Sequence, residues 1–270
     1  MRLRTAGRMM RGGAGPVAAL FSSVAAVSLL TAAPPIGAQE TGSLARRIAA
    51  APDGTVRFHY PAREGICGDG HGINIHRETD DVDGRRCEDG PVWVEIEKSE
   101  SRVTDLDMWV GRTRSSRDAP RTDLGATDAR QAADYLLGLA RGGAADLGDE
   151  AVGAAALADV EVWPELLEMA RDAKLDTGTR ESAIFWLAQQ AGDRATEDLE
   201  AIVREDGDSE VRQAALFGLS QLPEGAGFDS LVKVVRENDD PELVQVSLFW
   251  LGQTGDPRAI SLFEEILARP

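Results

Sequence analysis

The chain has 270 residues, of which 43% are hydrophobic and 28% are charged, and its formal net charge is −17 at pH 7. This length and composition allow two soluble domains with buried cores. So acidic a chain repels phosphate groups, and its sequence contains no basic patch, so it is not expected to bind nucleic acid or a membrane surface.

The segment 1–38 has the pattern of an export signal. Four arginines and no acidic residue precede an apolar run over residues 17–33, and small residues follow it at 37 and 38. A basic start, a short apolar run and small residues before a cleavage point are typical of secretory signal peptides. We expect cleavage after Ala38, with Ala33 as the competing position and an uncleaved anchor as the alternative. The mature protein is then periplasmic or secreted.

Residues 39–111 are predicted to form a small β-rich module that begins with a short helix over 43–51. Val56, Phe58 and Tyr60 alternate with polar neighbours, and a second alternating stretch covers residues 92–110. Alternation with β-branched and aromatic residues is typical of strands, so residues 92–110 are predicted to be a hairpin that turns near 99–101. Residues 112–122 are polar and lack periodicity, which is typical of a linker.

The two cysteines, Cys67 and Cys87, are predicted to form a disulfide. An exported chain meets oxidising conditions, and the bond would close a loop of about 20 residues. The alternative is a zinc site in which His71 and His76 join the two sulfurs. Its spacing matches no zinc module, and oxidation removes both thiolates, so we expect no metal ion and no cofactor.

An acidic stretch in the same loop raises the possibility of calcium binding. Asp80, Asp81 and Asp83 precede Gly84, but Thr79 and Gly90 occupy the first and last ligand positions of the EF-hand pattern. A hydrated turn is therefore the expectation here.

Residues 123–270 are predicted to be helical throughout and to repeat. One apolar phrase occurs three times at a constant spacing, at 183–189, 215–221 and 247–253. A second set of positions has the same spacing: Leu199, Leu231 and Phe263. Two apolar helical phrases per repeat at a constant period indicate stacked helix pairs, that is, an α-solenoid. The fold class is thus α+β multidomain, with a β module before an α-α superhelix.

The aromatic residues of the first phrase are predicted to lie in the core between repeats. Phe185, Phe217 and Phe249 occupy one position of the repeat. Aromatic side chains bury large areas and dominate protein cores. We therefore expect these three residues to pack inside, together with the second set of repeat positions, and not to form a ligand pocket.

The stretch Asp208–Leu216, with its 32-residue period and the Gly-Asp turns at 192–193 and 255–256, resembles the short HEAT repeats of many bacterial proteins. These repeats are also similar to those of phycobilisome lyases. One departure is Val244, which stands where Arg180 and Arg212 occur in the preceding repeats. The resemblance implies a stack of helix pairs that binds protein or acts as a scaffold, and it implies no single activity.

Catalysis is not expected, because all three histidines, His59, His71 and His76, lie in the β module, so the helical region cannot assemble a Ser-His-Asp site. We expect a non-catalytic scaffold for a protein partner. Its binding surface is predicted from helix positions expected to be exposed: Glu210, Gln213, Glu242 and Gln245. Two rival functions are a tetrapyrrole lyase and a structural spacer that presents the β module.

Overall fold

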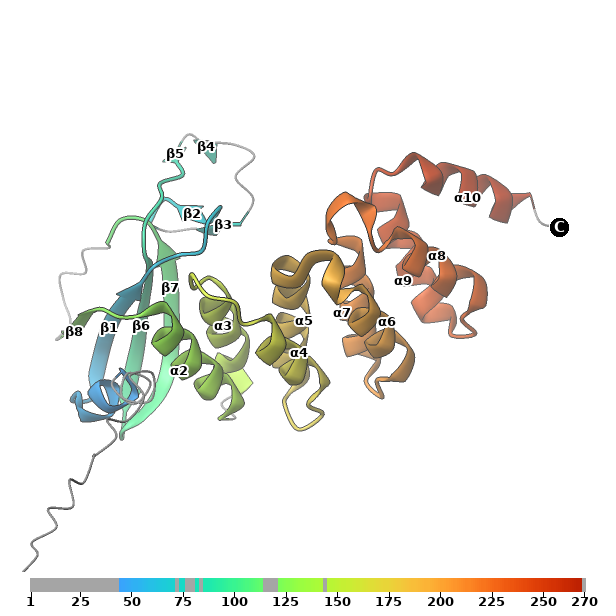
Figure 1. The fold of residues 1–270 in the computed structure, drawn as a ribbon. Helices are drawn as coiled ribbons and strands as arrows, with labels where there is room; N and C mark the ends of the chain where they lie inside the picture. The colour runs from blue at the N-terminus through green and yellow to red at the C-terminus, as the bar shows by residue number, and fades with distance from the viewer. Residues whose placement is uncertain are drawn as a thin grey trace, which may run out of the picture. The chain divides into compact units, whose positions relative to one another are not determined.

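The computed structural model describes residues 44–70, 73–75, 81–82, 85–113, 121–142 and 145–268. All of them belong to one unit of the chain, in which a short helix and the strands come first and the other helices follow (Figure 1). The predicted signal peptide lies outside the described residues. Among those described, no helix is both long and apolar enough to cross a membrane.

A four-stranded sheet forms the first part, in the order β7-β6-β1-β8. It consists of β1 (Gly54–Tyr60), β6 (Val92–Ser99), β7 (Arg102–Val110) and β8 (Arg121–Ala126). β6 and β7 form the predicted hairpin, and its turn residues Glu100 and Ser101 both have positive φ. The Asp53 carboxylate accepts hydrogen bonds from both of their backbone N–H groups, at 2.8 and 3.1 Å, which holds this turn. The alternation of apolar residues in β1 and β6 becomes an alternation of burial.

β8 was not expected, since residues 121–122 were predicted to end a linker and residue 123 to begin the helical region. β8 instead pairs in parallel with β1 at the edge of the sheet. An ion pair between Arg57 and Asp123 joins the two strands, and the Thr127 N–H donates to the His59 carbonyl at 2.8 Å. An edge strand with one large apolar residue, Leu124, has no alternating pattern to detect.

The short helix near the start is present at residues 44–50. Leu44 and Ile48 from this helix enter the core. At its end the buried Lys98 ammonium donates to the carbonyls of Ile48 at 2.7 Å and Ala51 at 2.6 Å. Lys98 thereby satisfies carbonyl groups that the end of the helix leaves without partners.

The predicted disulfide between Cys67 and Cys87 is confirmed, with a Cα–Cα distance of 5.4 Å. It closes a region with two small sheets, one of β2 (Cys67–Gly68) and β3 (Ile73–Asn74), the other of β4 (Asp81–Val82) and β5 (Arg85–Arg86).

The histidines of the alternative zinc set, and most of the acidic stretch considered for calcium, lie outside the described residues. Within the described part, no cluster of three or more His, Cys, Asp or Glu side chains could hold a metal ion.

The helices after residue 128 follow one another as pairs. Their bounds are α2 (Ala129–Arg141), α3 (Ala145–Ala156), α4 (Trp163–Arg171), α5 (Thr177–Ala191), α6 (Thr196–Glu205), α7 (Ser209–Ser220), α8 (Phe228–Glu237), α9 (Pro241–Gln253) and α10 (Pro257–Leu267). In each repeat the first helix packs on the first helix of the next, so α3, α5, α7 and α9 form one layer. The predicted HEAT-like solenoid is therefore confirmed.

The first helices begin in the same way because the same residue type recurs at the same repeat position. Asp176, Asp208 and Asp240 hold this position in successive repeats, and each accepts a hydrogen bond from a backbone N–H in the first turn, at 2.9–3.0 Å. Such N-caps satisfy donors that the helix itself leaves free. The capping aspartates thus set the same starting point for each of these helices.

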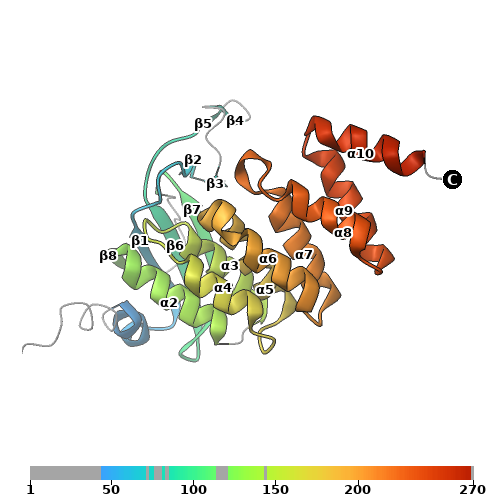
Figure 2. The same cartoon turned by 45° about the vertical axis from the view of Figure 1, so that its right-hand side comes forward.

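The sheet packs directly on the helices, with α2 and α3 against it (Figures 1 and 2). The buried Tyr60 hydroxyl donates to the Ala154 carbonyl of α3 at 2.6 Å, and the ring of Phe58 meets Tyr135 of α2 edge-on at 6.3 Å. The Arg63 N–H also donates to the Leu157 carbonyl at 2.9 Å. The repeats therefore do not hold the β module at a distance, as the spacer hypothesis supposed.

The aromatic repeat position is not buried, contrary to the prediction, although Phe185 packs against the core. Phe249 is 56% exposed, and Phe185 and Phe217 are half-buried. The buried positions of these helices belong instead to the neighbouring residues Ile184 and Leu216. A constant period shows that a position is repeated, but one residue along a helix is a turn of about 100°, enough to move a side chain from the core to another face.

The second set of repeat positions differs along the stack. Leu199 on α6 and Leu231 on α8 are fully buried. Phe263 on α10 packs against the core but is only partly buried. The last pair has no following repeat to cover it among the described residues, which accounts for this difference.

Candidate functional site

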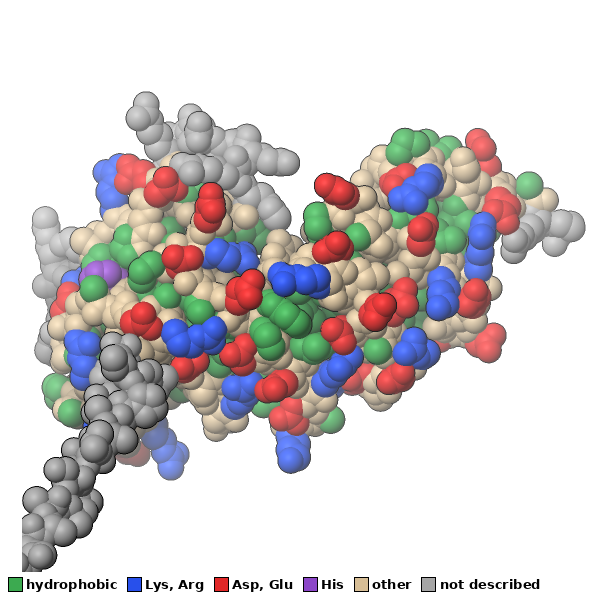
Figure 3. All heavy atoms as spheres, in the orientation of Figure 1, with side chains coloured by type: hydrophobic (Ala, Val, Ile, Leu, Met, Phe, Trp, Pro, Cys, Tyr) green, Lys and Arg blue, Asp and Glu red, His purple; other side chains and the backbone are tan. Residues whose placement is uncertain are grey.

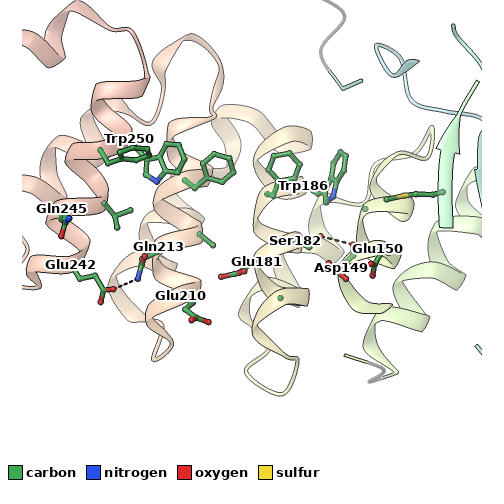
Figure 4. A pocket seen from close by; sticks show the side chains of 18 residues that line it. Asp149, Glu150, Glu181, Ser182, Trp186, Glu210, Gln213, Glu242, Gln245 and Trp250 are labelled. Atoms are coloured by element: carbon green, nitrogen blue, oxygen red, sulfur yellow. Dashed lines mark hydrogen bonds between the residues drawn. The ribbon is translucent and has the colours of Figure 1, made fainter. Parts of the chain in front are cut away.

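A groove of about 1240 Å³ crosses the layer of first helices (Figure 4). Residues of α3, α5, α7 and α9 line it, and Met108 of β7 lies at one end. The side chains fall into an aromatic set and an acidic set. The aromatic members are Phe185, Trp186, Phe217, Phe249 and Trp250, and the acidic members are Asp149, Glu150, Glu181, Glu210 and Glu242.

The five aromatic side chains form a continuous row across three repeats. Phe185 contacts Trp186 at 5.1 Å between ring centroids and stacks on Phe217 at 6.1 Å. Phe217 contacts Trp250 at 4.6 Å, and Trp250 contacts Phe249 at 4.9 Å. These separations are in the range that aromatic pairs favour. The row is thus held in place by its own contacts while its members still face the groove.

The aromatic row does not continue onto α3, because glycine takes the aromatic position there. Gly153 stands one repeat before Phe185 and lines the groove. A Cβ atom at Gly153 would lie 3.1 Å from the Met108 Cε and 3.3 Å from the Trp186 Nε1. Glycine therefore lets the β7 methionine and the α5 tryptophan approach α3 closely, and the β module contributes one end of the site.

The acidic set has no cation beside it among the described residues. No Lys or Arg of this part of the chain lines the groove, and none of the five carboxylates forms an ion pair there. By contrast, all nine described arginines of the helical region are paired with acidic groups. On the face of the molecule drawn in Figure 3, acidic and basic side chains are accordingly interspersed.

Two of these carboxylates hold protons more tightly than usual. A hydrogen bond with the Asp149 side chain, together with burial, raises the pKa of Glu150 to about 7. Burial raises the pKa of Glu181, and the nearby charges of Glu210 and Asp208 raise it further. Both shifts arise where carboxylates are desolvated or crowded with no opposite charge to compensate. A cation placed in the groove would relieve both effects.

All four residues predicted for a partner-binding surface line the groove: Glu210, Gln213, Glu242 and Gln245. The Gln213 side-chain amide donates to the Glu242 carboxylate at 3.1 Å, which links α7 to α9. On α5, α7 and α9, the polar groove residue lies one turn before the aromatic one, as in Gln213 and Phe217.

The sequence prediction missed the aromatic row as part of the site, and it missed Met108, Asp149 and Glu150. A signal was present for Asp149, which stands one repeat before Glu181 and two repeats before Gln213. No repeat signal could have found Met108, because it comes from the β module.

His59, the described histidine, does not line the groove. It lies on β1 with its ring 4.2 Å from Trp93, and burial lowers its pKa, so the imidazole is neutral at pH 7. The groove therefore has carboxylates and amides but no imidazole among the described residues.

Residues 196–270 match the family model for HEAT repeats. No curated protein sequence matches the chain. Among solved structures, the chain is similar to one from the complex of CpcE and CpcF of phycocyanin lyase from Nostoc sp. PCC7120. The identity is 22%, the match covers 52% of this chain and 90% of that chain, and the TM-score is 0.40. The family match confirms the predicted resemblance to HEAT repeats.

Proposed function

Because the chain carries HEAT repeats, we propose that it is an exported, non-catalytic scaffold that binds another protein in the groove across α3, α5, α7 and α9. The aromatic row carries this proposal. Large aromatic side chains at a solvent-facing groove are the usual anchors of protein interfaces. Stacked repeats also bind their partners along extended surfaces of this kind.

The contacts between rings favour a preformed binding surface. Phe217 is held between Phe185 and Trp250 on its two sides. Rigid aromatic anchors lose little conformational entropy when a partner covers them. The packing of the sheet on α3 places Met108 beside Gly153, so the β module helps to fix the α3 end of the groove.

Site-specific photo-crosslinking of the full chain in its native envelope tests the proposal. A photoreactive residue at Gln213 or Gln245 is expected to yield the same protein adduct, because both positions line the groove. The control position is Glu197, which is exposed on α6 and does not line the groove. The adduct should also weaken in Phe249→Ser, a change at an exposed side chain that leaves the core intact. Equal adducts from Glu197, or none from either groove position, would contradict the proposal.

Export is supported by the disulfide, since such bonds persist in oxidising compartments. The intact mass of the protein from its native source tests this part. We expect the mass of a chain that starts at Gln39, with two hydrogens fewer than the reduced form. A chain that keeps its first residues and two free thiols would contradict export.

A tetrapyrrole lyase is the rival function. Open-chain tetrapyrroles carry two propionate groups, which the five carboxylates of the groove would repel. We therefore expect the absorbance spectrum of a bilin to stay unchanged when the purified protein is added. A shifted spectrum that depends on Trp250 would favour the lyase function instead.

A further inference from the structure

The charge of the groove restricts what can occupy it. Its five carboxylates lie along the first helices of four successive repeats and lack a cation in the described structure, whereas each described arginine elsewhere in the helical region has an acidic partner. Bringing an anionic or purely apolar segment into the groove would desolvate these carboxylates without compensation. A segment with positive side chains would compensate them.

The aromatic row also favours a partner with positively charged side chains. Arg and Lys side chains bind over aromatic faces, and the guanidinium group can stack on a ring while donating hydrogen bonds at its edge. On α5, Glu181 lies one helical turn from Phe185, so an aromatic face and a carboxylate are offered side by side. On α7, Gln213 and Phe217 repeat this arrangement, and Glu210 adds the carboxylate.

The size of the groove favours an extended chain over a helix. Crossing from α3 to α9 takes three steps of about 8–10 Å each, the usual distance between packed helices. A volume of about 1240 Å³ over that length leaves a mean cross-section of about 40–50 Å². A helix with side chains, about 10–12 Å wide, needs roughly 80–110 Å². An extended chain needs about 48 Å², from strand and sheet spacings of about 4.8 and 10 Å.

We infer that the groove takes an extended basic segment of a partner protein, with an arginine or lysine at about every third residue. This inference rests on the proposed function and names the chemistry of its partner. The spacing follows from the polyproline II form of an extended chain, which has three residues per turn and rises about 3.1 Å per residue. Every third side chain then lies on the same face, about 9 Å from the one before, which is one step between neighbouring first helices. Successive basic side chains then reach the carboxylates of successive repeats, and the residues between them point away.

Synthetic peptides and the full-length protein provide the test. The probe is a 12-residue peptide with arginine at every third position and serine or glycine between. One matched peptide has the same composition with the four arginines adjacent, and another has glutamate in place of arginine. Calorimetry is expected to show that the spaced arginine peptide binds most tightly and that its affinity falls when salt is raised from 50 to 500 mM.

Variants of the protein locate the binding. The double change Glu181→Gln with Glu210→Gln keeps the shape of both side chains. It is expected to lower the affinity of the protein for the spaced arginine peptide by roughly 3- to 30-fold. The control Glu197→Gln removes a charge from α6, outside the groove, and should change the affinity less than about twofold.

Failure of this inference is distinguishable from failure of the proposed function. No binding of the spaced peptide, equal binding of the glutamate peptide, or no effect of the double variant would overturn the basic-segment inference. Crosslinked adducts at Gln213 would still support a protein-binding groove in those cases. If the adjacent-arginine peptide binds as tightly as the spaced one, the extended geometry is wrong.

Discussion

Replacing Asp206 by alanine should destabilise the repeats far more than an ordinary surface substitution. Asp206 follows α6 and forms an ion pair with Arg180 of α5, which is only 3% exposed. The same guanidinium donates two hydrogen bonds, of 3.0 and 2.9 Å, to the Ala170 carbonyl at the end of α4. Arg180 therefore joins three helices from two consecutive repeats, and Asp206 is the group that balances its charge.

The magnitude follows from burial. Removing one partner of a buried ion pair leaves an uncompensated charge, which costs about 3–5 kcal/mol. The free energy of unfolding of a native protein is only about 5–15 kcal/mol, so a large share of the stability is lost. Asp206→Asn keeps a hydrogen-bond acceptor without the charge, and its effect should lie between those of the alanine variant and the unchanged protein.

Hydrogen exchange is the suitable assay, because stacked repeats can open one part at a time. Amides of α5 and α6 in Asp206→Ala should lose protection equivalent to about 3–5 kcal/mol. Arg204→Ala serves as the control, because Arg204 and its partner Glu205 are 61% and 67% exposed and such pairs contribute about 0–1 kcal/mol. If Asp206→Ala costs no more than this control, Arg180 does not depend on the ion pair and the reasoning is refuted.

Three further results are expected. Gly227→Ala should lower the free energy of unfolding by about 1–3 kcal/mol, because the added Cβ would lie 2.0 Å from a backbone oxygen of α7. The control Gly207→Ala, whose added Cβ would have no atom within 4 Å, should lower it by less than about 0.5 kcal/mol, and equal losses in the two variants would contradict this account. Reducing the disulfide, whose cysteines are 20 residues apart, should cost about 3 kcal/mol in urea unfolding, and an unchanged midpoint would show that the loop is not constrained by it. The pKa of Glu150 rises on folding from 4.5 to about 7, so the folded state binds more protons and the free energy of unfolding should fall as the pH rises between these values. Glu150→Gln should flatten this slope in melting curves, and a slope that persists would assign it to another group.

The strand and helix patterns illustrate what local sequence can predict. The hairpin over residues 92–110 was predictable because alternation is a property of each strand and needs no partner to be recognised. β8 was not predictable, since residues 121–126 become a strand only through pairing with β1 and the contact between Arg57 and Asp123. Its existence depends on a neighbour that is distant in the chain, which no local pattern records.

The first helices that line the groove show the same difference between predictable and unpredictable features. Glu210 and Gln213 were predicted as surface positions and do line it, because helical periodicity places polar residues away from the core. Phe249 was predicted to be buried and is exposed, because an apolar residue at the edge of the buried stripe can face either the core or the solvent. Only the packing of the neighbouring repeats decides between them.

By itself, the sequence determined that pairs of helices repeat at a constant period, where the first helices begin, and which two cysteines join. These features follow from the period of the apolar residues, from the capping side chains and from the presence of two cysteines in the chain. All three can be read from the sequence without knowing which surfaces meet in space. Tertiary structure alone decided that the sheet packs on the helices, that Met108 closes one end of the groove, and that the aromatic row faces it beside five carboxylates. Those outcomes depend on which surfaces meet in space, and burial is a property of the neighbours rather than of the residue.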